Sequence, residues 1–291
     1  MLQKFLMRNI YCFILFIYFS SFAQNDEKAL RDSIFIDQVE NQGNKKPKVL
    51  HAEPLYIDLI RDLGARKGER EWNVGYGIID ETNFNRYEAL VEYEWAPIDR
   101  LGLEIETPFS FYQARDNTTR DQTPESKLDG LQLAAQYTFL VDPKRNISLA
   151  GGYLHEFAFN SFRNYGRGRF FTGNVYSPFF VGAKRFGSNF HSLIYTGPIW
   201  EVGNGNFENE FAYQINTNFH YMLTGTRNFL GVEINQIYID GKMETILRPQ
   251  MRLEISEKLM IGIVTGIPIQ TEISRFSTFF RLIYEPSFLE H

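Results

Sequence analysis

The chain has 291 residues, of which 44% are hydrophobic and 22% are charged, so it can bury a large core and is not a disordered polypeptide. Its mean hydropathy is -0.29, and no run of about 18 apolar residues follows the first segment, which excludes a bundle of transmembrane helices. The net charge of -5 and the lack of a basic patch exclude nucleic acid as a partner. Aromatic residues make up 16% of the chain, which is more than a soluble core ordinarily needs.

Residues 1–23 have the pattern of a cleaved secretory signal peptide. Lys4 and Arg8 precede an apolar run, and Ser21 and Ala23 place small residues before the expected cut at Gln24. The single cysteine lies within the apolar run, so the mature chain would have no thiol. This excludes disulfides, thiolate catalysis and cysteine metal sites in the exported protein.

Two different segments follow the signal peptide. Residues 24–50 are polar and carry charges of both signs, and we expect them to form a mobile leader. Next, Pro54 stands at a favourable first helical position and Gly64 is placed as a C-terminal cap. This predicts a short helix over residues 54–63, which should dock against the rest of the protein because so short a helix is marginal in water. Its apolar stripe consists of Leu55, Leu59, Ile60 and Leu63.

From Glu71 onward the hydrophobic period changes from 3.6 to 2, which is typical of strands with one apolar face. One clear case is the apolar series Phe211, Tyr213 and Ile215, which alternates with Ala212, Gln214 and Asn216. Twelve segments of this kind follow one another near residues 70–80, 85–96, 100–113, 129–141, 146–159, 172–185, 189–200, 208–223, 227–239, 242–255, 258–270 and 275–285.

The length of each connection depends on whether it follows an even-numbered or an odd-numbered strand. Those after the even-numbered strands are tight, whereas the long polar ones follow odd-numbered strands at residues 115–127, 160–171 and 201–207. One end of the structure should therefore have only turns, and the other end should carry the loops.

An even number of long strands, polar on one face and apolar on the other, is typical of an outer-membrane barrel, in which a closed sheet pairs every backbone group. A large β-sandwich would explain the alternation but not the parity of the loops, and the strands exceed its usual length. We predict an all-β fold: a single antiparallel transmembrane β-barrel of about 12 strands with a short N-terminal periplasmic helix. Rings at strand ends would form interfacial girdles, among them Trp72, Tyr93, Trp95, Phe109, Tyr137, Phe139, Tyr221, Phe229 and Tyr284.

The run HAEPLYIDLIRDLGARKGE at residues 51–69 resembles a family of uncharacterised outer-membrane β-barrel proteins, which carry an HAEPLYID-type motif just before the first strand, EWNVGYG here. The resemblance implies a barrel fold and an outer-membrane location. It implies no catalytic residues. The expected organisation is a signal peptide at residues 1–23, a periplasmic leader with the short helix at residues 24–69, and the barrel at residues 70–291.

The polar faces of the predicted strands carry an uneven distribution of charge. If they line the lumen, they place an acidic wall near a basic one. The simplest interpretation is a salt-bridge network that fills the barrel, because isolated charges in a narrow interior are costly to desolvate. The functional interpretation is a constricted polar pore that selects small solutes. The expected lumen-lining charges are Glu88, Glu92, Glu94, Glu104, Glu106, Arg248, Arg252 and Arg281.

The predicted helix also has two interpretations: a clamp on the periplasmic rim, or a plug that enters the lumen. In either position Asp58, Arg61 and Asp62 could pair with the charged walls. The histidines have no spacing typical of metal ligands, so we expect no metal and no cofactor.

We expect a narrow channel or passive transporter for small polar solutes, and not an enzyme. One alternative is a non-conducting barrel that serves as an anchor or binds surface ligands through residues 115–127 and 160–171. A second alternative is a lipid-modifying enzyme that uses His155, His191 or His220. The expected partners are outer-membrane lipid, a small polar solute and the barrel-assembly machinery, with an unknown oligomeric state.

Overall fold

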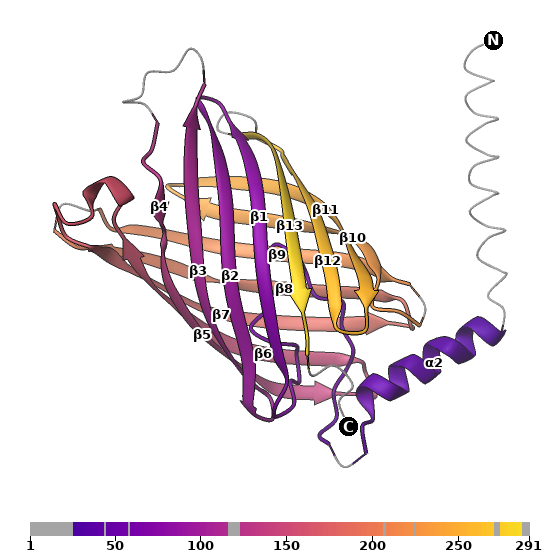
Figure 1. The fold of residues 1–291 in the computed structure, drawn as a ribbon. Helices are drawn as coiled ribbons and strands as arrows, with labels where there is room; N and C mark the ends of the chain where they lie inside the picture. The colour runs from indigo at the N-terminus through magenta and orange to yellow at the C-terminus, as the bar shows by residue number, and fades with distance from the viewer. Residues whose placement is uncertain are drawn as a thin grey trace, which may run out of the picture.

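The computed structural model describes residues 26–43, 45–57, 59–115, 123–205, 208–223, 225–270 and 274–286. The expected signal peptide lies outside the described residues. One α-helix, α2 (Asp26–Glu40), precedes the strands and projects to one side of the sheet (Figure 1). A 3-10 turn, η2 (Phe162–Asn164), lies in the connection between β6 and β7. In the described part of the chain, no helix has the length and apolar character needed to cross a membrane.

The rest of the described chain is dominated by antiparallel strands, most of them 10 to 16 residues long. They are β1 (Arg70–Glu81), β2 (Phe84–Ile98), β3 (Leu101–Ala114), β4 (Lys127–Leu128), β5 (Gly130–Asp142), β6 (Ile147–Phe159), β7 (Phe171–Phe186), β8 (Phe190–Gly203), β9 (Glu210–Met222), β10 (Phe229–Ile239), β11 (Lys242–Ser256), β12 (Leu259–Pro268) and β13 (Ser274–Tyr284).

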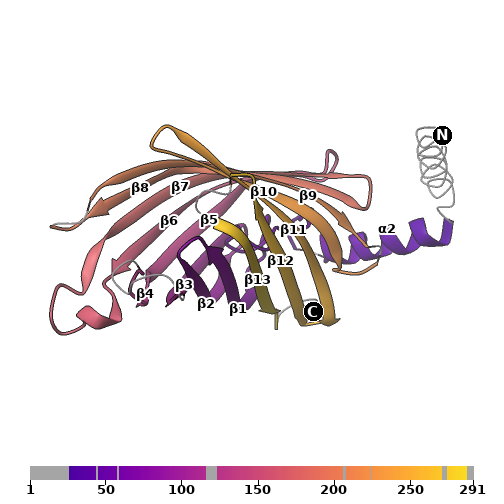
Figure 2. The ribbon, with the colours of Figure 1, turned by 90° about the horizontal axis from the view of Figure 1, so that it is seen from above.

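The sheet closes on itself. Each long strand pairs with its neighbours in sequence, and β1 pairs both with β2 and with the last strand, β13. The short β4 extends the ladder beside β3 at the start of the β5 region. The predicted barrel of about 12 strands is therefore confirmed, with one short strand added, and Figures 1 and 2 show the ring from the side and from above.

The outer face of the barrel is apolar and the inner face is polar, as the period-2 pattern predicts. On β9, Phe211 and Phe219 point outward and are 51% and 50% exposed, whereas Asn218 and His220 point inward and are buried. Most rings expected at the strand ends lie on the outside, Trp72 and Tyr284 among them. The prediction is wrong for Phe229, whose ring is buried in the interior against His220.

The two ends of the barrel differ. We call the end with the tight connections β2–β3, β5–β6, β7–β8, β9–β10 and β11–β12 the turn end, and the opposite end the loop end. The long connection of residues 160–170 lies at the loop end, as do residues 115 and 123–126 between β3 and β4. The expected segregation of turns from loops is confirmed, and the chain enters β1 and leaves β13 at the turn end.

Two predictions about the residues before β1 are wrong. Residues 26–40, expected to belong to a mobile leader, form α2. Its C-terminal carbonyl groups, at Val39 and Glu40, accept hydrogen bonds from the Arg66 guanidinium, which supplies the partners that a helix end lacks. Conversely, the described part of residues 54–63 contains no helix. That segment lies inside the barrel.

Candidate functional site

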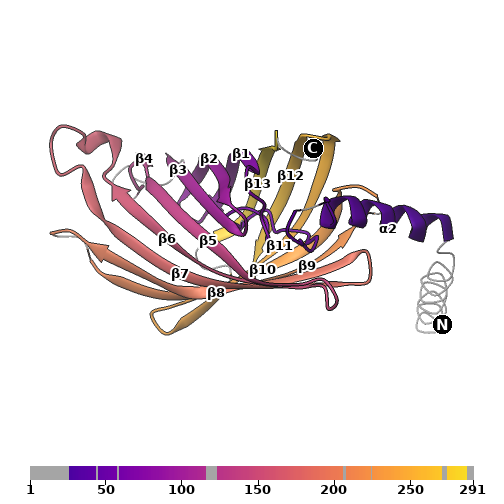
Figure 3. The same ribbon diagram turned by 90° about the horizontal axis from the view of Figure 1, so that it is seen from below.

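The segment that precedes β1 runs through the barrel interior as an irregular chain. We call its described residues, 48–57 and 59–69, the lumen segment. Figure 3 shows it as the thin dark trace inside the ring of strands. Leu55, Leu59 and Leu63 are almost completely buried against residues of the barrel wall. The segment therefore occupies the position of a plug, and the clamp on the rim that the sequence also allowed is not formed.

The barrel wall supplies the hydrogen bonds that a helix would have made internally. The backbone N–H of Leu55 donates to Gln250 Oε1 at 2.9 Å, and that of Ile57 donates to Glu233 Oε1 at 3.1 Å. The backbone N–H of Gly64 donates to Thr138 Oγ1 at 2.9 Å. Since buried backbone groups must find partners, these wall side chains explain why the segment is stable without regular structure.

Three buried histidines surround the start of the lumen segment. The backbone N–H of Ala52 donates to His191 Nδ1 at 3.0 Å, and its carbonyl lies 3.3 Å from His220 Nδ1. His51 Nε2 lies 3.0 Å from Ser148 Oγ. Burial, reinforced by the Arg185 guanidinium, lowers the pKa of His51 to about 3, so the imidazole is neutral in the docked segment.

Arg61 is the electrostatic centre of the lumen segment. It is fully buried and has a left-handed backbone with φ of 61°, a conformation that only a well-fixed non-glycine residue retains. Its guanidinium contacts Glu71 at 2.6 Å and Glu285 at 2.8 Å, and its backbone N–H donates to Glu94 at 2.7 Å. The Arg61 side chain thus contacts both the first strand of the barrel, at Glu71, and the residue after the last strand, Glu285.

A second group of ion pairs closes the turn end. Lys48 pairs with Asp62 and Glu69, and Arg227 pairs with Glu285. Burial opposes ionisation of Asp62, but Lys48 and Arg61 outweigh it and hold the pKa of this carboxyl well below its usual range. Burial also opposes ionisation of Glu285, yet the nearby Arg227 and Arg61 lower its pKa. Asp58, the third charge expected here, lies outside the described residues.

The predicted charged walls are neighbours rather than opposite faces. β13 pairs with β1, which pairs with β2, so Arg281 meets Glu92 directly, at 3.4 Å. Arg248 and Arg252 are buried in the interior on β11 and lie over the rings of Tyr56 and Phe229.

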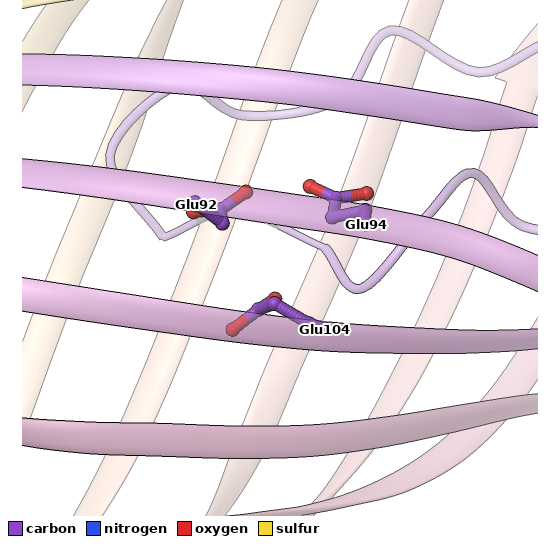
Figure 4. A group of neighbouring side chains, drawn as sticks. All are labelled: Glu92, Glu94 and Glu104. Carbon is purple, nitrogen blue, oxygen red and sulfur yellow. The ribbon is translucent and has the colours of Figure 1, made fainter.

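The acidic residues expected on β2 and β3 all have interior positions. Glu92, Glu94 and Glu104 are buried and offer carboxylate oxygens within 4.8 Å of one another (Figure 4). Such a group could hold a hard cation, a possibility that histidine spacing does not reveal. Asn73 Nδ2 donates to Glu92 at 2.8 Å and to Glu94 at 3.2 Å, and Arg281 neutralises Glu92. In this structure, protein donors therefore stabilise two of the carboxylates.

Above the lumen segment, toward the loop end, lies a cavity of about 460 Å³ that we call the acidic cavity. Tyr56, Ile57 and Ile60 of the lumen segment contribute to its lining. Its remaining lining includes seven acidic side chains and one basic side chain, Arg281. The acidic ones are Glu88, Glu92, Glu104, Glu106, Asp129, Glu156 and Glu201.

Two further cavities border the lumen segment. One of about 590 Å³ reaches Tyr56 and has a mixed lining that includes Arg86, Arg248 and Glu244. The other, of about 220 Å³, lies among the ion pairs of the turn end and includes Lys48 and Arg252 in its lining. The lumen segment thus separates space near the loop end from space at the turn end.

Sequence reasoning missed the wall residues that bind the lumen segment. Gln250, Glu233, His191 and His220 all occupy inward positions of alternating strands, and this parity is the signal that could have found them. Gly102 was missed too. A Cβ atom at this position would lie 2.0 Å from the Ile60 carbonyl oxygen, so only glycine allows the segment to pack so closely.

Of the histidines considered for an enzyme, His191 and His220 lie side by side and His155 lies apart from them. His191 and His220 bind Ala52 inside the barrel, as described above. His155 stacks on Phe157 and lies beside Tyr176 on another part of the wall. The three side chains therefore do not meet in one catalytic arrangement.

Comparison with known proteins agrees with the fold. The model of the HAEPLYID-like family matches residues 47–285. An outer membrane channel from Pseudomonas putida F1 is similar at 15% identity, with a TM-score of 0.63 over 77% of this chain and 98% of that chain. The NanC porin is similar at 9% identity, with a TM-score of 0.52 over 74% of this chain and 98% of that chain. No curated protein matches.

Proposed function

We infer that this chain, which belongs to the HAEPLYID-like family, is an outer-membrane channel for small polar solutes whose lumen is closed by its own N-terminal segment. The observation that carries this proposal is the lumen segment, whose backbone donors are bound by inward side chains of the wall. The same contacts would stabilise a permanently filled barrel, so conductance after removal of the segment distinguishes a channel from an anchor. We interpret the segment as a closed gate.

The apolar outer face of the barrel supports an outer-membrane location. Large apolar side chains remain exposed around the barrel, including Phe211, Leu230 and Phe280, each about half exposed. A monomeric water-soluble protein rarely exposes so continuous an apolar surface, whereas lipid chains would cover it. We propose that the tight turns face the periplasm, which places the lumen segment at the periplasmic side, and that residues 1–23 direct export.

The cavities support the passage of solute. The acidic cavity lies on the loop side of the lumen segment, and the cavity of about 220 Å³ among the ion pairs lies on the turn side. A solute that enters from the loops would reach Tyr56, Ile57 and Ile60 before it could continue. Conduction therefore requires the lumen segment to move.

Planar-bilayer recording tests the proposal. A variant that lacks residues 24–69 should show steady conductance, whereas the full chain should be closed or open only briefly. The matched control lacks residues 24–38, which removes most of α2 but keeps Glu40 and the lumen segment, and it should behave like the full chain. If the larger deletion folds in detergent yet gives no conductance, the channel function is wrong, and a non-conducting anchor or ligand binder is favoured.

One observation favours the loops as a binding surface in that second case. Glu125, in the connection after β3, bonds to Ser161 and contacts Arg163 at 2.9 Å, both in the connection after β6. The bridge between Lys127 and Ser161 joins the same two connections. These residues form a linked structure at the loop end, and replacing Arg163 by Ala would test whether it binds a surface ligand.

A further inference from the structure

The strand register places a row of acidic side chains along the inner wall. Direct partners across neighbouring strands connect Glu92 to Glu106, then Gln132 and then Glu156. The same row continues through Val175 to Glu201 and ends at Glu210. We call the residues Glu92, Glu106, Glu156, Glu201 and Glu210 the carboxylate row.

The carboxylate row leads from the loop end into the acidic cavity. Glu210 and Glu201 lie at the loop-end termini of β9 and β8, whereas Glu92 lies deep on β2. Neighbouring strands are about 4.8 Å apart, so Glu106, Glu156 and Glu201, which occupy every second strand, are roughly 10 Å apart along the wall. A ligand that bound all three would need positive charges distributed along its length.

Nearby cations balance only part of the charge of this wall: Arg281 lies near Glu106 as well as Glu92, and Lys127 lies near Glu156 and Glu201. Glu92 is paired with Arg281, but Glu106, Glu156 and Glu201 form no salt bridge within the described ranges. Glu156 accepts a hydrogen bond only from the neutral amide of Gln132. Glu106 and Glu156 are half-buried and Glu201 is exposed near the loop end, so their combined charge faces the cavity and would attract a cation that entered it.

An independent observation points to a ligand in the same cavity. Tyr195 lines it and is only 7% exposed, yet among the described residues its hydroxyl has no hydrogen-bond partner. Its ring is fixed by stacking on Phe179, with a centroid separation of 4.7 Å. The hydroxyl oxygen itself is open to the cavity, so this group is available to a bound molecule.

The remaining lining selects among cations. Leu90, Leu154 and Phe279 contribute apolar surface between the carboxylates, and the volume of about 460 Å³ far exceeds that of a single metal ion. Aromatic faces and aliphatic side chains suit carbon chains that carry ammonium groups. A hard metal ion needs several oxygens converging on one point, an arrangement that Glu92, Glu94 and Glu104 offer but that the more widely spaced Glu106, Glu156 and Glu201 do not.

We propose that the carboxylate row and the acidic cavity bind small organic cations with two or more ammonium groups, and that such amines are the solutes of the channel. The ammonium groups would contact Glu106, Glu156 and Glu201, and the Tyr195 hydroxyl would accept a further hydrogen bond. This inference rests on the proposed channel function for its transport step, but the binding step is measurable separately.

Calorimetric titration of the full chain in detergent with spermidine tests the binding step. Spermidine should bind, and Glu156→Gln and Glu201→Gln should each weaken it about tenfold or more, because each removes one charge-assisted hydrogen bond. Glu257→Gln, which makes the same charge change in an exposed turn at the other end, should leave affinity unchanged. Tyr195→Phe should also weaken binding, without altering the fold.

Each remaining outcome is decisive. Absence of spermidine binding, or equal weakening by Glu257→Gln, overturns the inference. So does Mg²⁺ binding that is as sensitive as spermidine binding to Glu156→Gln, because the site would then be one for metal ions. If spermidine binds as expected but the variant lacking residues 24–69 does not conduct, the channel function is wrong and the cation site stands. If that variant conducts but spermidine does not bind, only the cation site is wrong.

Discussion

Arg61 is the residue on which docking of the lumen segment depends most. Replacing it with Met would keep much of its volume but leave Glu71, Glu94 and Glu285 without their shared cation. Removing one partner from a buried ion pair costs about 3–5 kcal/mol, so Arg61→Met should release the segment from the wall. The expected result is increased conductance in bilayers and faster proteolysis of residues 48–69.

The control for this prediction is Lys67→Met, which removes the same charge from an exposed position of the same segment. It should change neither conductance nor proteolysis appreciably. A closed and protease-resistant Arg61→Met protein would show that hydrogen bonds and apolar contacts hold the segment without the arginine.

Gly102 gives a steric test of the same docking. A methyl group there would collide with the backbone carbonyl of Ile60, 2.0 Å away, so Gly102→Ala should displace the segment and raise the channel's open probability. Gly151→Ala is the matched control, since the nearest atom to its added Cβ lies at 3.7 Å. Equal single-channel records for both variants would contradict the docking described here.

At the scale of elements, the sequence predicted the strands well and the N-terminal segment poorly. Period-2 alternation indicates lipid on one face and a polar interior on the other, a contrast that is clear on β9 and weak on β12, whose inward residues Met260 and Val264 are apolar. The stripe over residues 54–63 has the spacing of a helix, but wall groups such as Gln250 and Glu233 compete for its backbone donors. Those competitors lie more than 170 residues away in sequence, so local pattern cannot reveal them.

The helix α2 was missed for a different reason. Its sequence is polar, and Leu30 and Ile34 remain exposed, so it lacks a clear apolar face. Its end is instead held by polar contacts: Glu40 pairs with Arg185 at 2.7 Å and also accepts a hydrogen bond from the backbone of Leu50. Such contacts with the wall and with the next segment leave no periodic signal in the sequence.

Docking of the lumen segment should weaken in acid. The pKa of docked His51 is about 3, below the value of about 6.5 for a solvated imidazole, so the released segment binds more protons than the docked one. The stabilisation of docking by neutral His51 is therefore complete above about pH 6.5 and is lost as the pH falls toward 3. The charged or titratable groups around His51 are Arg185, Lys48, Asp62, His191 and His220.

Recording conductance from about pH 7 to about pH 4 measures this effect. The full chain should open progressively, and His51→Gln, which can still bond to Ser148 but cannot take up a proton, should open less. The pKa values of Asp62 and Glu285 are lowered in the docked state, so these carboxylates stabilise docking fully above their ordinary pKa. This stabilisation is lost only at still lower pH. An identical acid response in His51→Gln would assign the transition to other groups.

At the scale of the whole molecule, closure of the barrel decides which predicted charges meet. The sequence placed Glu92 and Glu106 on inward faces, but it did not connect them to Glu156 and Glu201, because register across strands is set by turns and bulges. Pairing of β1 with β13 likewise brings Arg281 beside Glu92. The alternation of the sequence predicts which residues point inward. Which of these residues are neighbours depends on the strand register of the closed sheet.

The acidic interior should make the open barrel cation-selective. Glu92 and Glu104 line the acidic cavity on adjacent strands, and replacing both by Gln removes two of its seven negative charges while keeping their shapes. In the variant that lacks residues 24–69, this change should move the reversal potential in a KCl gradient toward zero, because a lower wall charge attracts fewer cations. The double change Asp240→Asn and Glu257→Gln, at exposed turns on the two ends, should leave the reversal potential unchanged. An unaltered reversal potential in the Glu92 and Glu104 variant would show that these carboxylates only stabilise the interior and do not border the conducting path.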